Sequence, residues 1–350
     1  MKNPARRYLV LVAIATGLTL VGVVGFNATM DPSWSVSFPN ELNLYQKSFD
    51  ERRQKVAYLR YRAGSELYRS VLVGSSRATF IPVDAFPDEG LFNFGLSSLN
   101  PDECASVIRY FKSRQGDPER VYLLMDFFGT QKDPERRVAH FGEIVELVEE
   151  PFYRPKILLS ADTLNDSKDV WRLRFVRGYR EGRRDYYSGP GEKHLRRVDD
   201  IERQSIAARR KEAFLERYFP ANYSYRQDYM TMLQDMREAA APAEVVVLTA
   251  PISSELFVAV MERGHFDDYG RWLGELVTCF GRVFDSMGFT ELTSKAGAYH
   301  DLDHFYPEQA YPWLQEALER RGGGYGAWVD AGNLDSHLES QRDLVLKHLR

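Results

Sequence analysis

Three side chains in this sequence are of the types that together carry out nucleophilic acyl transfer. Ser76 follows the apolar run at residues 71–74, and Asp301 and His304 lie three residues apart much later in the chain. On a turn of helix this spacing makes two side chains neighbours, so the Asp301 carboxylate could hydrogen-bond one ring nitrogen of His304. Such a bond fixes the histidine tautomer and leaves the other nitrogen free to act as a base toward a serine hydroxyl.

Other interpretations of the same residues stay open at this point. Ser76 could be a helix N-cap or an anion ligand, because serine is common at helix N-termini. His300 and His304 are four residues apart with aspartates between them, a spacing that could hold a metal ion. No distant third ligand candidate accompanies them, so we expect neither a metal nor a cofactor. A solvated polar loop is the remaining interpretation of residues 299–308.

Short apolar runs predict the strands that would position these side chains. The runs are at residues 71–74, 91–95, 120–125, 245–250 and 282–284. Because helical segments alternate with them, they indicate a parallel α/β sheet. In such sheets, ligands and reacting groups gather at the carboxyl ends of the strands. Ser76, Gly95 and Asp126 each lie at or just after a predicted strand end, so we expect them at one edge of the sheet.

The segments between these runs predict helices. Asn100, Pro101 and Glu103 form a sequence signature for a helix start, with an N-cap, a proline at the first position and a capping-box acid. Further helices are expected at residues 46–62, 225–241, 267–280 and 309–320.

The start of the chain predicts a membrane anchor. Residues 9–26 carry no charge, and Lys2, Arg6 and Arg7 precede them. As a helix this stretch would rise about 27 Å, close to the roughly 30 Å hydrocarbon core of a bilayer. The preceding basic residues favour a cytoplasmic N-terminus with the remaining chain outside. A cleaved signal peptide is the alternative, but the run is longer than usual for one and lacks Ala-x-Ala where a cut would fall.

Composition places the remaining chain among globular proteins. Of its 350 residues 44% are hydrophobic and 27% are charged, and the net charge of −4 gives no indication of nucleic-acid binding. Cys104 and Cys279 lack the spacing of a zinc site or a disulfide scaffold, and they either pair or are buried thiols. The expected domains are an anchor at 1–27, a linker and juxtamembrane helix at 28–66, an α/β domain at 67–321 and a tail at 322–350.

Residues 131–223 interrupt the strand and helix rhythm. The segment is rich in arginine, tyrosine and acidic residues, and a structureless loop of this length would be unusual in a compact domain. We therefore expect a mostly helical insertion. Its cationic and aromatic side chains could bind an anionic glycan, or they could form salt-bridged, solvated helix faces.

The order of these features resembles the SGNH, or GDSL-type, hydrolase superfamily, in particular its membrane-anchored bacterial members. The resemblance covers roughly residues 71–320 and implies a three-layer α/β/α, flavodoxin-like fold around a parallel five-stranded sheet. It also implies that Ser76 is the nucleophile and that the Gly95 amide donates to the oxyanion. Asp301 and His304 would be the acid and the base.

The sequence departs from the family pattern at Asp126. The family has an asparagine in this block, and its side chain donates to the oxyanion. An ionised aspartate cannot donate and would repel the developing charge, and losing one donor typically costs on the order of 3 kcal/mol. Three alternatives follow: Asp126 is protonated, other donors such as the amides after Ser76 complete the oxyanion hole, or the protein is not a catalyst. Arg77 could pair with Asp126 or bind an anionic group of the substrate.

The resemblance and the anchor together imply a single-pass protein of the bacterial inner membrane, with its globular domain in the periplasm or outside the cell. The implied activity is that of a serine esterase or O-acyltransferase acting on acyl esters of a cell-surface polysaccharide. The alternative is a non-catalytic SGNH-fold component that binds glycan or an envelope protein in a polysaccharide assembly.

Overall fold

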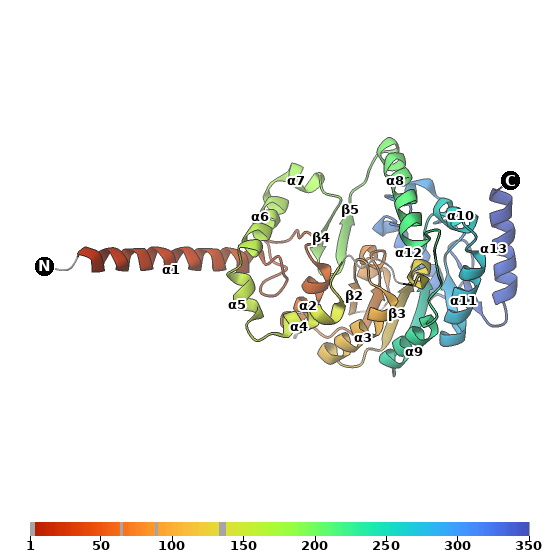
Figure 1. Ribbon diagram of the computed structural model, residues 1–350, viewed down its shortest axis with the longest axis horizontal. Coiled ribbons are helices and arrows are strands. Elements are labelled where there is room, and N and C mark those ends of the chain that lie inside the picture. Colours follow the sequence, from red (N-terminus) through yellow and green to blue (C-terminus); the bar gives the residue numbers. More distant parts are fainter. Residues whose placement is uncertain (1–3, 64–65, 88–89, 133–137, 350) are drawn as a thin grey trace. The chain divides into compact units, whose positions relative to one another are not determined.

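The computed structural model describes residues 4–63, 66–87, 90–132 and 138–349 (Figure 1). These residues form two compact units. We call them the anchor unit, Met1–Ser65 with Glu143–Pro190, and the sheet unit, Glu66–Gly142 with Gly191–Arg350. Lys2, cited above for membrane orientation, and residues 133–137 of the expected insertion lie outside the described residues.

The sheet unit is built on a mostly parallel sheet, which confirms the predicted α/β class. Its strands are β1 (Ser70–Gly74), β2 (Leu91–Gly95), β3 (Arg120–Met125), β6 (Glu244–Thr249), β7 (Arg282–Asp285) and β8 (Ala327–Asp330). Across the described residues the order is β2-β1-β3-β6-β7-β8, and β8 alone runs antiparallel to its neighbour. The prediction of five strands is wrong, because the four-residue β8 lies in the segment expected to be a tail.

Helices cover both faces of this sheet. The strands of the sheet unit are accompanied by η2 (Ala78–Phe80), η3 (Val83–Ala85), α3 (Pro101–Gln115), η4 (Phe127–Thr130), β5 (Glu192–Leu195), α8 (Asp200–Tyr218), α9 (Tyr229–Ala240), α10 (Ser254–Glu262), α11 (Phe266–Phe280), η5 (Ala296–Ala298), η6 (Pro307–Gln309), α12 (Ala310–Leu318) and α13 (Leu334–His348). The elements α3, α9 and α11 contact β1, β6 and β7 respectively, while α12 packs in a core with Leu72, Tyr122 and Phe284 of the strands. The predicted capping box at the start of α3 is confirmed by both of its hydrogen bonds, between Asn100 and Glu103.

The anchor unit holds the long apolar helix. Its elements are α1 (Pro4–Met30), α2 (Glu51–Tyr61), α5 (Tyr153–Leu158), α6 (Ala161–Phe175), α7 (Arg177–Glu181) and β4 (Asp185–Gly189), and α4 (Phe141–Glu149) begins at the boundary with the sheet unit. By length and composition α1 could cross a membrane, which is weak evidence for a single-pass anchor.

The segment after α1, for which the sequence predicts a linker, is ordered around a buried carboxylate. Asp31 accepts backbone hydrogen bonds from four consecutive residues, 35 to 38, at 2.7 to 3.1 Å. The fully buried Trp34 stacks on Phe38 and meets the edge of Tyr187, with ring centroids 4.7 and 5.0 Å apart. These aromatic contacts form part of the core of the anchor unit.

A buried polar cluster joins α13 to the sheet. The Asp285 carboxylate, at the end of β7, accepts hydrogen bonds from the Thr249 hydroxyl at 2.8 Å and from Tyr269, and it lies 2.8 Å from Nε2 of His337 on α13. Burial disfavours the charged imidazole, but the hydrogen bond and the charge of Asp285 outweigh it and raise the pKa of His337. Cys104 and Cys279 are both buried, free thiols.

We expect the sheet unit to lose stability as the pH rises through the raised pKa of His337. The ion pair contributes fully below the ordinary histidine pKa of 6.5 and is lost once the ring is neutral in the folded state. Urea unfolding between pH 5.5 and 8.5 measures this, and His337→Gln is expected to flatten that part of the pH profile. If the free energy of unfolding of His337→Gln fell with pH as steeply as that of the parent protein, other groups would be the cause of the pH dependence.

Candidate active site

Ser76 lies in the tight turn that joins β1 to η2. Its backbone carbonyl accepts hydrogen bonds from the Thr79 amide at 3.2 Å and the Thr79 hydroxyl at 2.6 Å, so the turn is closed on itself. The small residues Gly74 and Gly95 end the neighbouring strands β1 and β2 opposite one another in register. Ser76 is partly exposed, unlike the buried residues on either side of it.

His304 is held by a loop that follows β7, not by the helical turn that its spacing suggests. The loop is closed by a bridge between Tyr299 and Phe305 and by a 2.9 Å hydrogen bond from the His300 amide to the His304 carbonyl. Inside it, Oδ1 of Asp301 accepts the backbone amides of residues 303 and 304 at 3.0 and 2.7 Å. Asparagine and aspartate commonly make such local turns, which explains why a loop replaces the helix.

The structure brings Ser76, His304 and Asp301 into one chain of hydrogen bonds. The Ser76 Oγ lies 2.9 Å from Nε2 of His304, and Nδ1 of the same ring lies 2.9 Å from Oδ2 of Asp301. His304 and Asp301 are buried, and the Phe80 ring packs edge-on against the imidazole. This geometry places an oriented base within reach of a hydroxyl, which is the requirement for nucleophile activation.

Arg77 connects the turns around this site. Its side chain is 1% exposed, and it forms ion pairs with Asp126 after β3 and with Asp303 beside His304. Its Nε also donates to the Asp303 carbonyl at 3.0 Å, and its guanidinium lies over the Phe128 ring. Of the two roles considered from the sequence, the structure therefore shows pairing with Asp126, and the buried guanidinium is not presented to solvent.

The two buried carboxylates that Arg77 binds have pKa values shifted in opposite directions because their neighbours differ. Burial raises the pKa of Asp126, and the charge of Arg77 offsets only part of this rise. Burial also acts to raise the pKa of Asp303, but the charges of His304 and Arg210 outweigh it, so the pKa of Asp303 is lowered. Asp303 therefore stays ionised beside the imidazole.

Arg210, on α8, is a site residue that the sequence analysis missed. Its guanidinium binds Asp303 through two hydrogen bonds of 2.7 Å each. Lys193 on β5 was also missed: it is buried over the Phe80 ring and donates to the Thr79 hydroxyl at 3.3 Å. In the sequence nothing distinguishes these two from the many other cations of residues 131–223, whereas Asp303 lies between the two candidate residues Asp301 and His304.

The Gly95 amide, expected to donate to an oxyanion, already has an acceptor in this structure. It donates to Oδ1 of Asn93 at 2.9 Å. Glycine is nonetheless required here by space, because a Cβ at this position would lie 2.7 Å from the Thr79 nitrogen and 2.8 Å from the Ala78 carbonyl carbon. Gly95 thus lets the turn that carries Ser76 pack directly on β2.

We expect Gly95→Ala to destabilise the sheet unit by about 1–3 kcal/mol, because the added methyl group must displace backbone. The same displacement would move Ser76 relative to His304. Thermal unfolding measures the first effect. Gly297→Ala, where a Cβ meets no atom within 4 Å, is the matched control and should unfold like the parent protein. Equal unfolding temperatures for both variants would contradict the expected clash.

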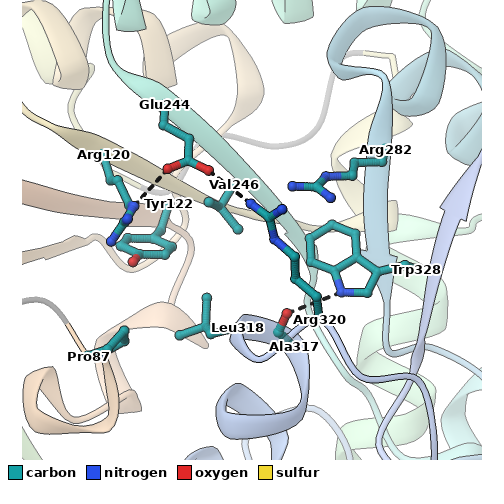
Figure 2. A pocket seen from close by; sticks show the side chains of 10 residues that line it. All are labelled: Pro87, Arg120, Tyr122, Glu244, Val246, Arg282, Ala317, Leu318, Arg320 and Trp328. Carbon is teal, nitrogen blue, oxygen red and sulfur yellow. Dashed lines mark hydrogen bonds and ion pairs between the residues drawn. The ribbon is translucent and has the colours of Figure 1, made fainter.

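Two cavities are relevant to ligand binding. One lies beside the site, between Arg77, Phe128 and Phe214 of α8. Its volume of about 10 Å³ is enough for about one water molecule. A larger pocket of about 150 Å³ lies at the opposite, amino-terminal edge of the sheet (Figure 2).

In the larger pocket, Arg120 and Arg320 both pair with Glu244, at 2.8 and 3.6 Å. The guanidinium of Arg282 lies over the Trp328 ring, 4.8 Å from its centroid. Figure 2 shows that these side chains surround the pocket without a serine, cysteine or histidine among them. Ser76 and His304 lie at the opposite edge, where the strands end.

A metal ion would compete with hydrogen bonds that are already made. In the part of the chain that the structure describes, the donor group that could hold a metal consists of Asp301, Asp303 and His304. His300 is not in this group: its Nδ1 lies 3.1 Å from the Arg196 carbonyl oxygen. Because two arginines already bind Asp303, the donor set fits an ion-pair network better than a cation site.

No protein-family model, curated protein or solved structure matches this chain.

Proposed function

We propose that the protein is a membrane-anchored serine esterase or O-acyltransferase of the SGNH type. The observation that supports this most directly is the hydrogen-bonded series of Ser76, His304 and Asp301 at the carboxyl edge of a mostly parallel sheet. The three residues come from segments more than 200 positions apart in sequence, and Ser76 is partly exposed at the end of that series.

In the proposed mechanism, Nε2 of His304 takes the Ser76 hydroxyl proton as Oγ attacks the ester carbonyl carbon. Asp301 holds the ring so that Nδ1 carries the proton and stabilises the resulting imidazolium. The tetrahedral intermediate expels the alcohol, which takes the proton from His304, and an acyl-serine remains. Water as the second nucleophile completes an esterase reaction, whereas a sugar hydroxyl completes an acyl transfer.

The oxyanion would rest on the backbone amide of Ser76. The Gly95 amide can contribute only if it leaves its acceptor on Asn93, and the ion-paired Asp126 is not a donor while it is ionised. We therefore expect a modest catalyst, since one missing donor costs on the order of a hundredfold in rate.

The location and substrate class of the proposed enzyme follow from α1 and the resemblance. Arg6 and Arg7 at the start of α1 favour a cytoplasmic N-terminus and an extracytoplasmic sheet unit. Acyl esters on a cell-surface polysaccharide are the substrates proposed for an enzyme in this place. This substrate class is proposed by analogy with the family that the sequence resembles.

A second candidate is a non-catalytic component of an envelope polysaccharide assembly. Two observations favour it. The cavity beside the site is about 10 Å³. The Gly95 amide is engaged with Asn93, and Asp126, which stands at the family's donor position, is paired with Arg77. A protein of this kind would keep the network as a structural element and bind glycan or an envelope protein elsewhere on its surface.

Labelling with a fluorophosphonate distinguishes the two candidates. The full chain in detergent should be labelled, and Ser76→Ala and His304→Ala should both abolish labelling. Ser336→Ala, which removes an exposed serine on α13, is the control and should label like the parent protein. A folded protein that takes no label, or label that survives in Ser76→Ala, would overturn the serine mechanism and favour the non-catalytic candidate.

A further inference from the structure

The apolar helix α1 ends inside the anchor unit, where α5 and α6 lie across it (Figure 1). Nδ2 of Asn27 donates to the Leu158 carbonyl of α5 at 2.9 Å, and the Ser167 hydroxyl of α6 donates to Oδ1 of Asn27 at 2.9 Å. Residues 4–22 of α1 are exposed, whereas Asn27 is buried. A bilayer crossed by α1 would therefore have its surface near Asn27, at the level of α5 and α6.

One side of α6 continues from this contact as an exposed aromatic stripe. Trp171 and Phe175 follow Ser167 at intervals of four residues, so the three share one helix face. Their rings lie 5.5 Å apart, and the side chains are 45% and 49% exposed. Val170 and Leu173, on the other side of the helix, are buried in the protein. The stripe thus begins at the contact with α1. The described residues leave both of its aromatic rings about half exposed.

The ends of α5 carry apolar side chains of the same kind. Phe152 and Leu159 flank this helix and are 69% and 53% exposed, while Tyr153 between them is buried. Leu158, whose carbonyl binds Asn27, is the last residue of α5. Leu159 is therefore next to a residue that contacts α1, and Phe152 lies at the other end of the same short helix.

Charge in this segment suits a membrane surface. Residues 152–184 contain nine basic and four acidic side chains. Aromatic rings are enriched at the headgroup level of bilayers, and clustered lysine and arginine attract anionic lipid. We call the exposed apolar residues Phe152, Leu159, Trp171 and Phe175 the bilayer face. Three of them are aromatic, and all four lie in this basic segment of the unit that holds the anchor.

We propose that the bilayer face lies in the headgroup layer of the membrane that α1 crosses. This inference rests on the membrane anchor in the proposed function and is independent of the serine chemistry. The anchor alone would tether the unit; the bilayer face would also fix how the unit is oriented on the lipid surface. Its aromatic rings would enter the acyl boundary, and the neighbouring basic side chains would contact anionic headgroups.

Nitroxide labels test this in the full chain, reconstituted in nanodiscs of phosphatidylcholine and phosphatidylglycerol. Phe152→Cys and Trp171→Cys place a label on the bilayer face, and Ile201→Cys, an 82% exposed position on α8, is the matched control. Cys104 and Cys279 are buried, which limits background labelling. We expect the ratio of oxygen to nickel-chelate accessibility to be several-fold higher at Phe152 and Trp171 than at Ile201.

A label at Leu18→Cys on α1 separates the two hypotheses. If Leu18 is in lipid while Phe152 and Trp171 show the aqueous ratio of Ile201, the bilayer face is overturned and the anchor stands. If Leu18 itself is aqueous, the anchor fails, and the inference with it. Labels at Phe152 and Trp171 that are shielded from both oxygen and nickel would indicate a protein partner and also overturn the proposal.

Discussion

Replacement of Arg77 by methionine is expected to lower the free energy of unfolding of the sheet unit by about 3–5 kcal/mol. The substitution keeps an unbranched side chain of similar length but leaves the buried carboxylates of Asp126 and Asp303 without this partner. Removing one member of a buried ion pair is costly because an uncompensated charge stays out of water. Urea unfolding followed by tryptophan fluorescence would measure the change, since Trp272 and Trp313 are buried in this unit.

Arg109→Met is the matched control for Arg77→Met. Arg109 also pairs with an aspartate, Asp235, but the two side chains are 50% and 45% exposed. Exposed pairs are worth about 0–1 kcal/mol, so this variant should unfold close to the parent protein. Similar losses in both variants would mean that burial of the Arg77 network does not determine its contribution.

Replacement of Asp301 by asparagine is expected to reduce the rate of fluorophosphonate labelling by about 10⁴-fold, the scale of loss when a triad histidine is held in the wrong tautomer. The asparagine carbonyl can still accept the backbone amides that close the loop, so the fold is kept. Its amide group, however, would donate toward Nδ1 of His304. The ring would then carry its proton on Nε2 and could not accept one from Ser76.

The pseudo-first-order rate of labelling, with circular dichroism as the check on folding, measures this effect. Asp84→Asn is the control: Asp84 is a carboxylate of the sheet unit that binds the Tyr311 hydroxyl at 2.8 Å and takes no part in the site. A rate for Asp301→Asn within tenfold of the parent would show that Asp301 does not set the histidine tautomer.

Local sequence patterns were enough to predict most of the sheet. Five of its strands were expected from apolar runs, and the least ambiguous, residues 245–250, corresponds to β6. The capping box at Asn100 was equally predictable because its hydrogen bonds join residues three apart. These features depend on neighbours in the chain, so a single sequence contains their cause.

What the sequence could not provide are contacts set by tertiary packing. β8 has four residues between a glycine-rich stretch and a helix, and only its pairing with β7 makes it a strand. Arg210 looks like its many neighbouring arginines until α8 brings it to Asp303. The engagement of the Gly95 amide by Asn93 depends on one side-chain conformation that no spacing rule predicts.

The antiparallel strand β8 has a consequence for the histidine loop. β7 leads directly into the segment that carries His304, and it pairs with β6 at Leu248 and Phe284 but with β8 along four residue pairs. α13 supports the same strand at its last residue, because His337 binds Asp285. The strand that precedes the His304 loop is thus supported by residues that are synthesised after His304. During biosynthesis we therefore expect the Ser76–His304 contact to become stable only after the segment beyond residue 326 has been made.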